Sequence, residues 1–114
     1  MLMTAMVFFG LAIVIGLMML MYVLASRSVP RILSFTHGPL AVIGLVLLII
    51  YSYLNTSPMM AVIALFVLVA LGGLTLFYKD ITGKPLPKWL ALVHGFIAIG
   101  TFFYLVTIAV SAAQ

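Results

Sequence analysis

The sequence has 114 residues, of which 68% are hydrophobic and 5% are charged, with a formal net charge of +4 and no cysteine. A soluble domain carries about 25% charged residues, and a fold of this size has too little interior to bury so much apolar surface, so we expect lipid to be the solvent. The lack of cysteine excludes disulfides, iron–sulfur clusters and thiolate metal sites.

Four apolar stretches follow one another along the chain, each long enough for a bilayer core that needs about 20 helical residues. We expect helices over Leu2–Ala25, Ile32–Leu54, Met59–Tyr78 and Lys88–Ser111. The connections between them are short: Ser26–Arg31, Asn55–Pro58 and Lys79–Pro87. Short connections favour sequential packing, so the sequence predicts an all-α membrane protein, a single domain of residues 1–114 that forms an up-down-up-down bundle of four transmembrane helices.

The basic residues all lie in or beside the first and third connections: Arg27, Arg31, Lys79, Lys84 and Lys88. By the positive-inside rule these two connections are cytoplasmic and both termini are outside. The positive charge therefore indicates topology, and no nucleic-acid partner is expected. We expect an integral membrane protein, of the bacterial inner membrane, with the lipid bilayer as its main partner.

Residues 1–57 align with residues 58–114 without a gap. Most of the matched leucines carry little weight in so apolar a chain, but a proline, six residues and a His-Gly pair recur in both halves. The alignment also pairs Gly16 with Gly73 and Ala41 with Ala98. It predicts two helix-hairpin repeats, 1–57 and 58–114. An even number of spans in each repeat makes them parallel, related by an axis along the membrane normal.

His37 and His94 are the two histidines of the chain, and the repeat places them at one depth, roughly 10 Å inside the starts of the second and fourth helices. An ionisable residue within a membrane segment is a functional-site hypothesis by default. Helices two and four lie on a diagonal of roughly 11–14 Å when neighbouring axes are about 8–10 Å apart. Direct contact or one small shared ion fits such a gap poorly, whereas a haem iron with one imidazole on each side fits it well.

Small residues share the helix faces of the two histidines. Around His37 these are Ser34, Ala41 and Gly44, and around His94 they are Ala91, Ala98 and Thr101. Two interpretations remain: such residues let membrane helices pack closely, or they clear a slot for a flat macrocycle. Gly16 and Gly73, predicted at a similar depth, permit close approach either by a porphyrin edge or by a neighbouring helix.

Haem carries two propionates, which require cations or water. Arg31 and Lys88 each stand six residues before a histidine, and Arg27 and Lys84 belong to the same membrane face. We expect Arg31 and Lys88 to be the propionate partners, although topology alone also explains basic residues at this face.

This arrangement resembles the haem-binding four-helix core of the membrane b-type cytochromes, with paired histidines on the second and fourth helices and glycines on the first and third. The resemblance covers nearly the whole chain. It implies one haem b, with His37 and His94 as the axial ligands of its iron, and electron transfer with quinone or a membrane redox partner. Members of this group commonly hold a second histidine on each ligand helix, and this sequence has none, so it implies one haem near the cytoplasmic face.

Other chemistries find less support in the sequence. Small four-helix multidrug exporters depend on a carboxylate within a membrane helix, and the predicted segments contain none. Met18, Met19 and Met21 could be soft Cu(I) ligands, but methionine is also a common apolar filler. Two classes stay open: an electron-transfer protein or quinone-linked oxidoreductase, and a non-redox membrane component such as a metal or haem carrier, a transporter or an assembly subunit. So small a bundle, with glycines on several faces, could form a homodimer.

Overall fold

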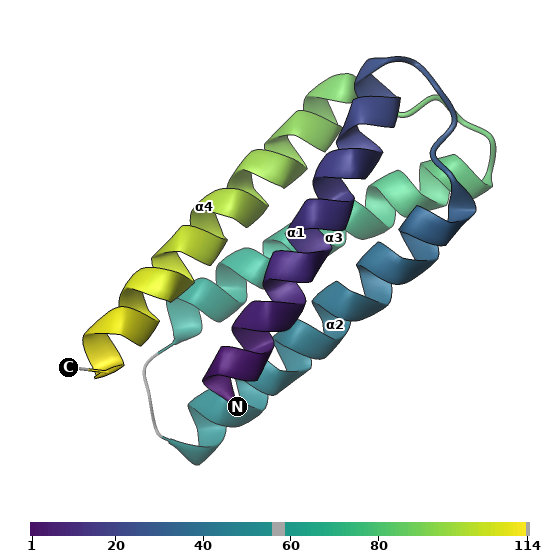
Figure 1. The fold of residues 1–114 in the computed structure, drawn as a ribbon. Helices are drawn as coiled ribbons and strands as arrows, with labels where there is room; N and C mark the ends of the chain where they lie inside the picture. Colours follow the sequence, from purple (N-terminus) through teal and green to yellow (C-terminus); the bar gives the residue numbers. More distant parts are fainter. Residues whose placement is uncertain (56–58, 114) are drawn as a thin grey trace.

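The computed structural model describes residues 1–55 and 59–113, which form four helices: α1 (Leu2–Leu24), α2 (Arg31–Leu54), α3 (Met60–Ile81) and α4 (Lys88–Ala113). They form an up-down-up-down bundle measuring 45 × 19 × 19 Å (Figure 1). Each helix packs against its two neighbours in the order α1, α2, α3, α4 and back to α1. Within the described ranges the diagonal pairs make no close backbone contact. The predicted all-α four-helix fold is confirmed.

The bundle presents an apolar exterior. Between 11% and 17% of the most apolar stretch of each helix is buried inside the chain, so most of the remaining apolar side chains are partly or largely exposed at its surface. All four helices are long and apolar enough to cross a membrane, and the 45 Å length matches a bilayer with its headgroup regions, about 40–45 Å. The chain is an integral membrane protein.

The predicted helix ends were accurate to one residue for α1 and α2, but α3 and α4 end later than expected. Helix α3 continues three residues past Tyr78, through Asp80 to Ile81, and α4 continues to Ala113. Hydropathy marks the hydrocarbon core, whereas backbone hydrogen bonding extends the helix beyond it. Asp80 therefore lies in the last turn of α3 and not in a connection. Most of the predicted connection 55–58 lies outside the described residues.

The repeated prolines stand one residue earlier than a first-turn position. Pro30 caps α2 with φ −58° and ψ 133°, and its carbonyl accepts a hydrogen bond from the amide of Leu33 at 3.0 Å. The carbonyl of Pro87 accepts from the amide of Ala91 at 3.1 Å. An N-cap residue is non-helical while its carbonyl already begins the hydrogen-bond ladder, and proline meets both conditions.

The two halves have equivalent turns after α1 and α3. Ser26 and Gly83, which are 57 positions apart, both have a left-handed backbone, with φ 58° and 72°. The next amide in each turn, that of Arg27 or Lys84, donates to the carbonyl five residues earlier at 2.9 Å. These are helix ends of the Schellman type, in which one left-handed residue returns the chain toward the last helical turn. Both turns thus carry a basic residue to the same end of the bundle.

Two clusters of buried side chains close the ends of the bundle. The larger lies beside the α2–α3 connection and comprises Ala5, Phe9, Leu48, Met59, Val62, Phe66 and Leu105. Within it the rings of Phe9 and Phe66 stack with centroids 4.0 Å apart and planes 6° apart. The smaller cluster, at the end of the basic turns, contains Val23, Val29 and Ala91. The histidine level lies between these two clusters.

Candidate bis-histidine site

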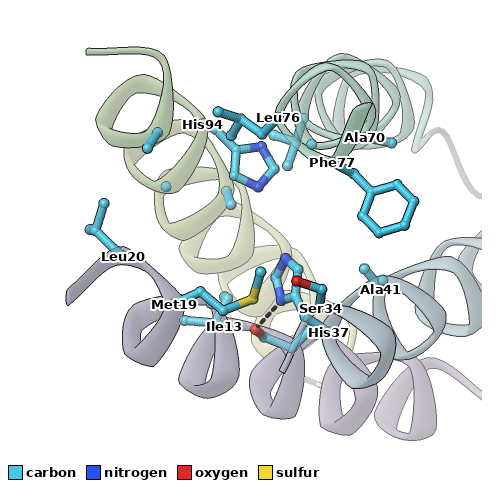
Figure 2. Close-up of a pocket in the computed structure, with 18 of the residues that line it drawn as sticks. Ile13, Met19, Leu20, Ser34, His37, Ala41, Ala70, Leu76, Phe77 and His94 are labelled. Atoms are coloured by element: carbon cyan, nitrogen blue, oxygen red, sulfur yellow. Dashed lines mark hydrogen bonds between the residues drawn. The ribbon is translucent and has the colours of Figure 1, made fainter. Parts of the chain in front are cut away.

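His37 of α2 and His94 of α4 face one another across the bundle. Their ring centroids are 6.3 Å apart and their ring planes are inclined at 75°. Figure 2 shows the two imidazoles directed toward each other from opposite sides of the cavity. The chain thus brings together the two residues, 57 positions apart, that the repeat predicts to lie at one depth.

The spacing between the rings matches two imidazoles that bind one metal ion. A histidine nitrogen lies about 2.0–2.1 Å from a bound first-row metal ion. With ring bonds of about 1.33 Å, that nitrogen lies about 1.1 Å from the ring centroid. Two ligands on opposite sides of a metal ion would therefore have centroids roughly 6.2–6.4 Å apart. The observed 6.3 Å falls within this range.

The gap between the two imidazoles is narrower than the diagonal helix distance indicates, so a small shared ion is not excluded by distance. The diagonal helices stand apart as expected, but both side chains lean inward, and the resulting gap suits any metal ion that binds imidazole. The number of ligands separates the candidates instead. The described residues hold no group of three or more histidine, cysteine or acidic side chains that could surround a bare ion. A structural zinc ion takes four ligands and a catalytic one three, so two imidazoles alone are too few.

A backbone carbonyl orients His37. The Nδ1 nitrogen of His37 lies 2.7 Å from the carbonyl oxygen of Ala12 in α1. A carbonyl only accepts hydrogen bonds, so Nδ1 carries the hydrogen and donates it, which leaves Nε2 with a free lone pair. Histidines that bind metals are commonly held in this way, with the second nitrogen donating to a carbonyl or carboxylate. The Nε2 nitrogen of His37 is therefore the one that could bind a metal ion.

His94 lacks this anchor. The residue equivalent to Ala12 in the second half is Val69, whose carbonyl interacts with His94. Nevertheless, Nδ1 of His94 is buried and forms no hydrogen bond with any part of the chain that the structure describes. The two imidazoles therefore share a position in the repeat but differ in how firmly the ring is held.

Gly16 and Gly73 give the imidazoles room. A Cβ atom built on Gly16 would lie 2.9 Å from Cε1 of His37, and one on Gly73 would lie 3.1 Å from Cε1 of His94. Both distances are shorter than ordinary side-chain contacts. The close approach predicted at these glycines is real, and the group that makes it is the histidine ring of the same helix hairpin. Proximity of a porphyrin edge to either glycine stays a prediction.

A cavity of about 660 Å³ surrounds the two rings. Its lining includes both histidines together with Gly16, Gly73, Ala41 and Ala98. The stacked rings of Phe9 and Phe66 line it toward the larger buried cluster. Its volume is within the range of small-molecule and cofactor sites, about 300–1,000 Å³. Ser34, Ala41, Ala91 and Ala98 thus border open space, as the slot interpretation requires. Gly44 instead lies against the Phe9 ring, and Thr101 does not line the cavity.

A smaller cavity of about 340 Å³ adjoins the first at the end of the basic turns. Its lining contains Arg27, Lys84 and Lys88, while Arg31 lines neither cavity. Asp80 borders both cavities. Lys88 therefore borders only the adjoining cavity, and its repeat partner Arg31 lies on the exposed surface at the start of α2. Pairing of either residue with a propionate stays a prediction.

Four residues that take part in the site were not predicted as site residues: Ala12, Asp80, Phe9 and Phe66. The Ala12 carbonyl could not be, because a backbone acceptor leaves no mark in the sequence. Asp80 was assigned to a connection because its charge ends the apolar stretch. The stacked pair, Phe9 and Phe66, did carry a signal, since the two positions match in the repeat. The methionines considered for copper diverge: Met19 lines the cavity, whereas Met18 and Met21 are 47% and 72% exposed.

Comparison with known proteins identifies no relative: no family model, curated protein or solved structure matches this chain.

Proposed function

We propose that this protein is a small membrane b-type cytochrome that holds one haem b between His37 and His94. The observation that carries the proposal is the 6.3 Å separation of two facing imidazoles inside a cavity of about 660 Å³. The separation suits one metal ion with two axial ligands, and the cavity leaves room around it. The two imidazoles come from matched positions of the two halves.

Ligand number favours haem over a bare metal ion. A porphyrin brings four nitrogens of its own, so the protein needs to provide only the two axial ligands. The lining beside the imidazoles consists of small or apolar side chains, including Ala41 and Ala98, which suit the face of a flat hydrophobic macrocycle better than a hydrated ion. The adjoining cavity is lined by the basic side chains of Arg27, Lys84 and Lys88, which are available to pair with two propionates.

Haem bound by two histidines supplies a reversible one-electron couple. The chain itself would orient the ligands and exclude water. The Ala12 carbonyl sets the tautomer of His37, and the glycines of α1 and α3 let both rings lie close against the backbone. The apolar lining would keep water from a bound haem, so electron exchange would be its main activity. We assign a membrane quinone or a redox protein as the exchange partner, at the end of the bundle that carries the basic turns.

The orientation belongs to the same proposal. We place the basic turns in the cytoplasm and both termini outside, in a bacterial inner membrane. An alkaline phosphatase fusion after Gln114 should then be active in a bacterial host, and a β-galactosidase fusion at the same point should be inactive. The opposite pattern would invert the orientation and place the histidines near the outer face.

The test of the function is spectroscopic. The full chain, expressed with haem supply and purified in detergent, should be red, show sharp reduced-minus-oxidised bands of a low-spin haem b, and contain one haem per chain by pyridine haemochrome assay. A colourless protein that also fails to take up added haem would refute the proposal and favour the non-redox class, such as a metal carrier or an assembly subunit.

A further inference from the structure

The histidine cavity extends outward beside α2. Three of its lining residues on this helix are exposed on the outer surface of the bundle: Phe35, Pro39 and Val42. Phe35 is 59% exposed and Val42 is 57% exposed. Their offsets, +4 and +7 from Phe35, place them on one stripe of the helix. A residue that both lines a cavity and faces outward stands at the rim of an opening.

A matching stripe on α3 forms the other side of this opening. Ala70, Leu74 and Phe77 line the same cavity at offsets of +4 and +7, and Leu74 is 63% exposed. The rings of Phe35 and Phe77 meet edge to face across the gap, with centroids 6.0 Å apart and planes at 72°. In Figure 2 the ring of Phe77 projects from α3 into the space in front of α2.

The opposite side of the cavity is more closed. The repeat relates the gap between α2 and α3 to the gap between α4 and α1. None of the cavity-lining residues on α4 is exposed, and on α1 the exposed lining residue is Leu17. Leu20, which is the repeat equivalent of Phe77, packs against the buried cluster of Val23, Val29 and Ala91. The repeat symmetry is thus broken in favour of one lateral opening.

Among the described residues, the ends of the bundle offer no comparable route for an apolar ligand. The stacked rings of Phe9 and Phe66 and the larger buried cluster close one end. The smaller buried cluster and the charged lining of the second cavity lie at the other. An opening rimmed by hydrocarbon and facing lipid admits a ligand that partitions into the bilayer, because no polar surface needs to be desolvated along the way.

We infer that haem passes between the bilayer and the histidine cavity through the gap between α2 and α3, with Phe35 and Phe77 as its gate. This inference rests on the proposed haem function. Haem is flat and mostly apolar, so it can pass edge-on between two helices while its propionates stay at the headgroup end. Pro39 supports movement of this part of α2, because a proline has no N–H to bond to the Phe35 carbonyl. Rotation of two phenylalanine rings and a small bend of α2 then open the gap.

The test uses the absence of native cysteine, which makes introduced thiols unique. The variant Phe35→Cys/Phe77→Cys is prepared without haem in lipid nanodiscs. Its two thiols are then joined by a reducible bis-thiosulfonate cross-linker, and mass spectrometry confirms the cross-link. We expect haem uptake, followed by absorbance, to slow by about tenfold or more, because a closed gate limits ligand exchange. Reduction of the cross-link should restore the rate. The matched control is Leu20→Cys/Leu92→Cys, the equivalent pair between α1 and α4, whose cross-linked and reduced forms should load haem at the same rate.

A second variant tests the gate without cross-linking. Phe35→Ala/Phe77→Ala removes both rings from the rim and should take up haem faster than the parent. Equal uptake by the cross-linked and reduced forms of Phe35→Cys/Phe77→Cys, with an unchanged rate in the alanine variant, would refute the lateral route while leaving haem binding intact. Failure of the parent itself to bind haem would refute the proposed function, so the two outcomes are distinguishable.

Discussion

The two histidines occupy equivalent places in the two halves of the chain, but their rings differ in hydrogen bonding and in how closely a glycine packs against them. His37 donates from Nδ1 to the Ala12 carbonyl at 2.7 Å, whereas Nδ1 of His94 is buried without a hydrogen-bond partner among the described residues. Gly16 lies tighter against its imidazole than Gly73 does, at 2.9 Å against 3.1 Å for a built Cβ atom. A repeated sequence therefore repeats the position of a ligand without repeating its hydrogen bonding.

This difference implies unequal roles for the two imidazoles in the proposed cytochrome. His37 has a fixed tautomer and a fixed ring plane before any metal arrives. His94 has only a weaker interaction, with the Val69 carbonyl, so its ring is held less firmly. A preorganised ligand loses less freedom on binding, so we expect His37 to contribute the firmer bond and His94 to be the ligand that an exogenous molecule displaces first.

Removal of either imidazole should have the largest effect. We expect His94→Ala to retain a five-coordinate haem on the anchored His37, and His37→Ala to lose most of its haem because the unanchored His94 remains alone. Optical spectra and haem content of both purified variants, measured against the parent, check this difference. A normal six-coordinate low-spin spectrum in either variant would contradict ligation by both histidines, and better haem retention in His37→Ala would reverse the proposed ranking.

Enlarging the small residues of the cavity should come next. Ala41→Leu and Ala98→Leu, matched positions in the two repeats, place a branched side chain where the macrocycle would lie, and overpacking typically costs about 1–3 kcal/mol. We expect haem content to fall in both, with the thermal stability of the haem-free protein unchanged. Ala61→Leu on the exposed face of α3 is the control. Full haem occupancy in both cavity variants would show that the ring lies elsewhere, and a less stable haem-free protein would indicate ordinary helix packing.

A smaller and graded effect is expected at the two glycines. A methyl group at Gly16 or Gly73 would press on the histidine ring, at a cost within the overpacking range of about 1–3 kcal/mol, or roughly a 5- to 150-fold loss of haem affinity. Gly16→Ala should lose more than Gly73→Ala, because its distance is shorter and the hydrogen-bonded His37 cannot yield. Haem titration of the two variants gives the comparison, with Gly100→Ala, whose Cβ would meet nothing within 4 Å, as the control. Equal losses would show that the His37 anchor adds no rigidity.

The smallest effect is expected at the basic residues. Lys88→Gln removes a cation from the cavity beside the proposed propionates, and Arg31→Gln removes one that lines no cavity. A nearby cation stabilises the reduced haem, so Lys88→Gln should lower the midpoint potential. A surface charge interaction of about 0.2–1 kcal/mol corresponds to roughly 10–40 mV. Arg31→Gln should leave the midpoint potential unchanged. A larger shift in Arg31→Gln than in Lys88→Gln would support Arg31 as a propionate partner.

Much of the fold follows from the sequence because a lipid solvent leaves few choices. Apolar length predicts the four helices, and short connections predict the order in which they pack. The end of α3 at Ile81 was not predicted, because hydropathy describes the solvent around a helix and not the hydrogen bonds of its backbone. The position of Asp80 beside both cavities was not predicted for the same reason.

At the site, the sequence predicts which residues meet but not how each is held. The 57-residue repeat indicated that His37 and His94 share a depth, and the structure places them face to face. The Ala12 anchor, the inward lean of both rings and the open side between α2 and α3 depend on side-chain rotamers and on small helix shifts. A repeat treats its two halves alike, so it cannot reveal the one gap that opens.

The most direct measurement is the low-temperature electron paramagnetic resonance spectrum of the oxidised, haem-loaded protein. Two neutral imidazoles on one iron should give a low-spin signal, and ring planes inclined at 75° should make it highly anisotropic, with one strongly shifted low-field feature. The feature should disappear in both His37→Ala and His94→Ala. A high-spin signal in the parent protein, or a low-spin signal that survives the loss of either histidine, would contradict the central claim that these two residues hold the same iron.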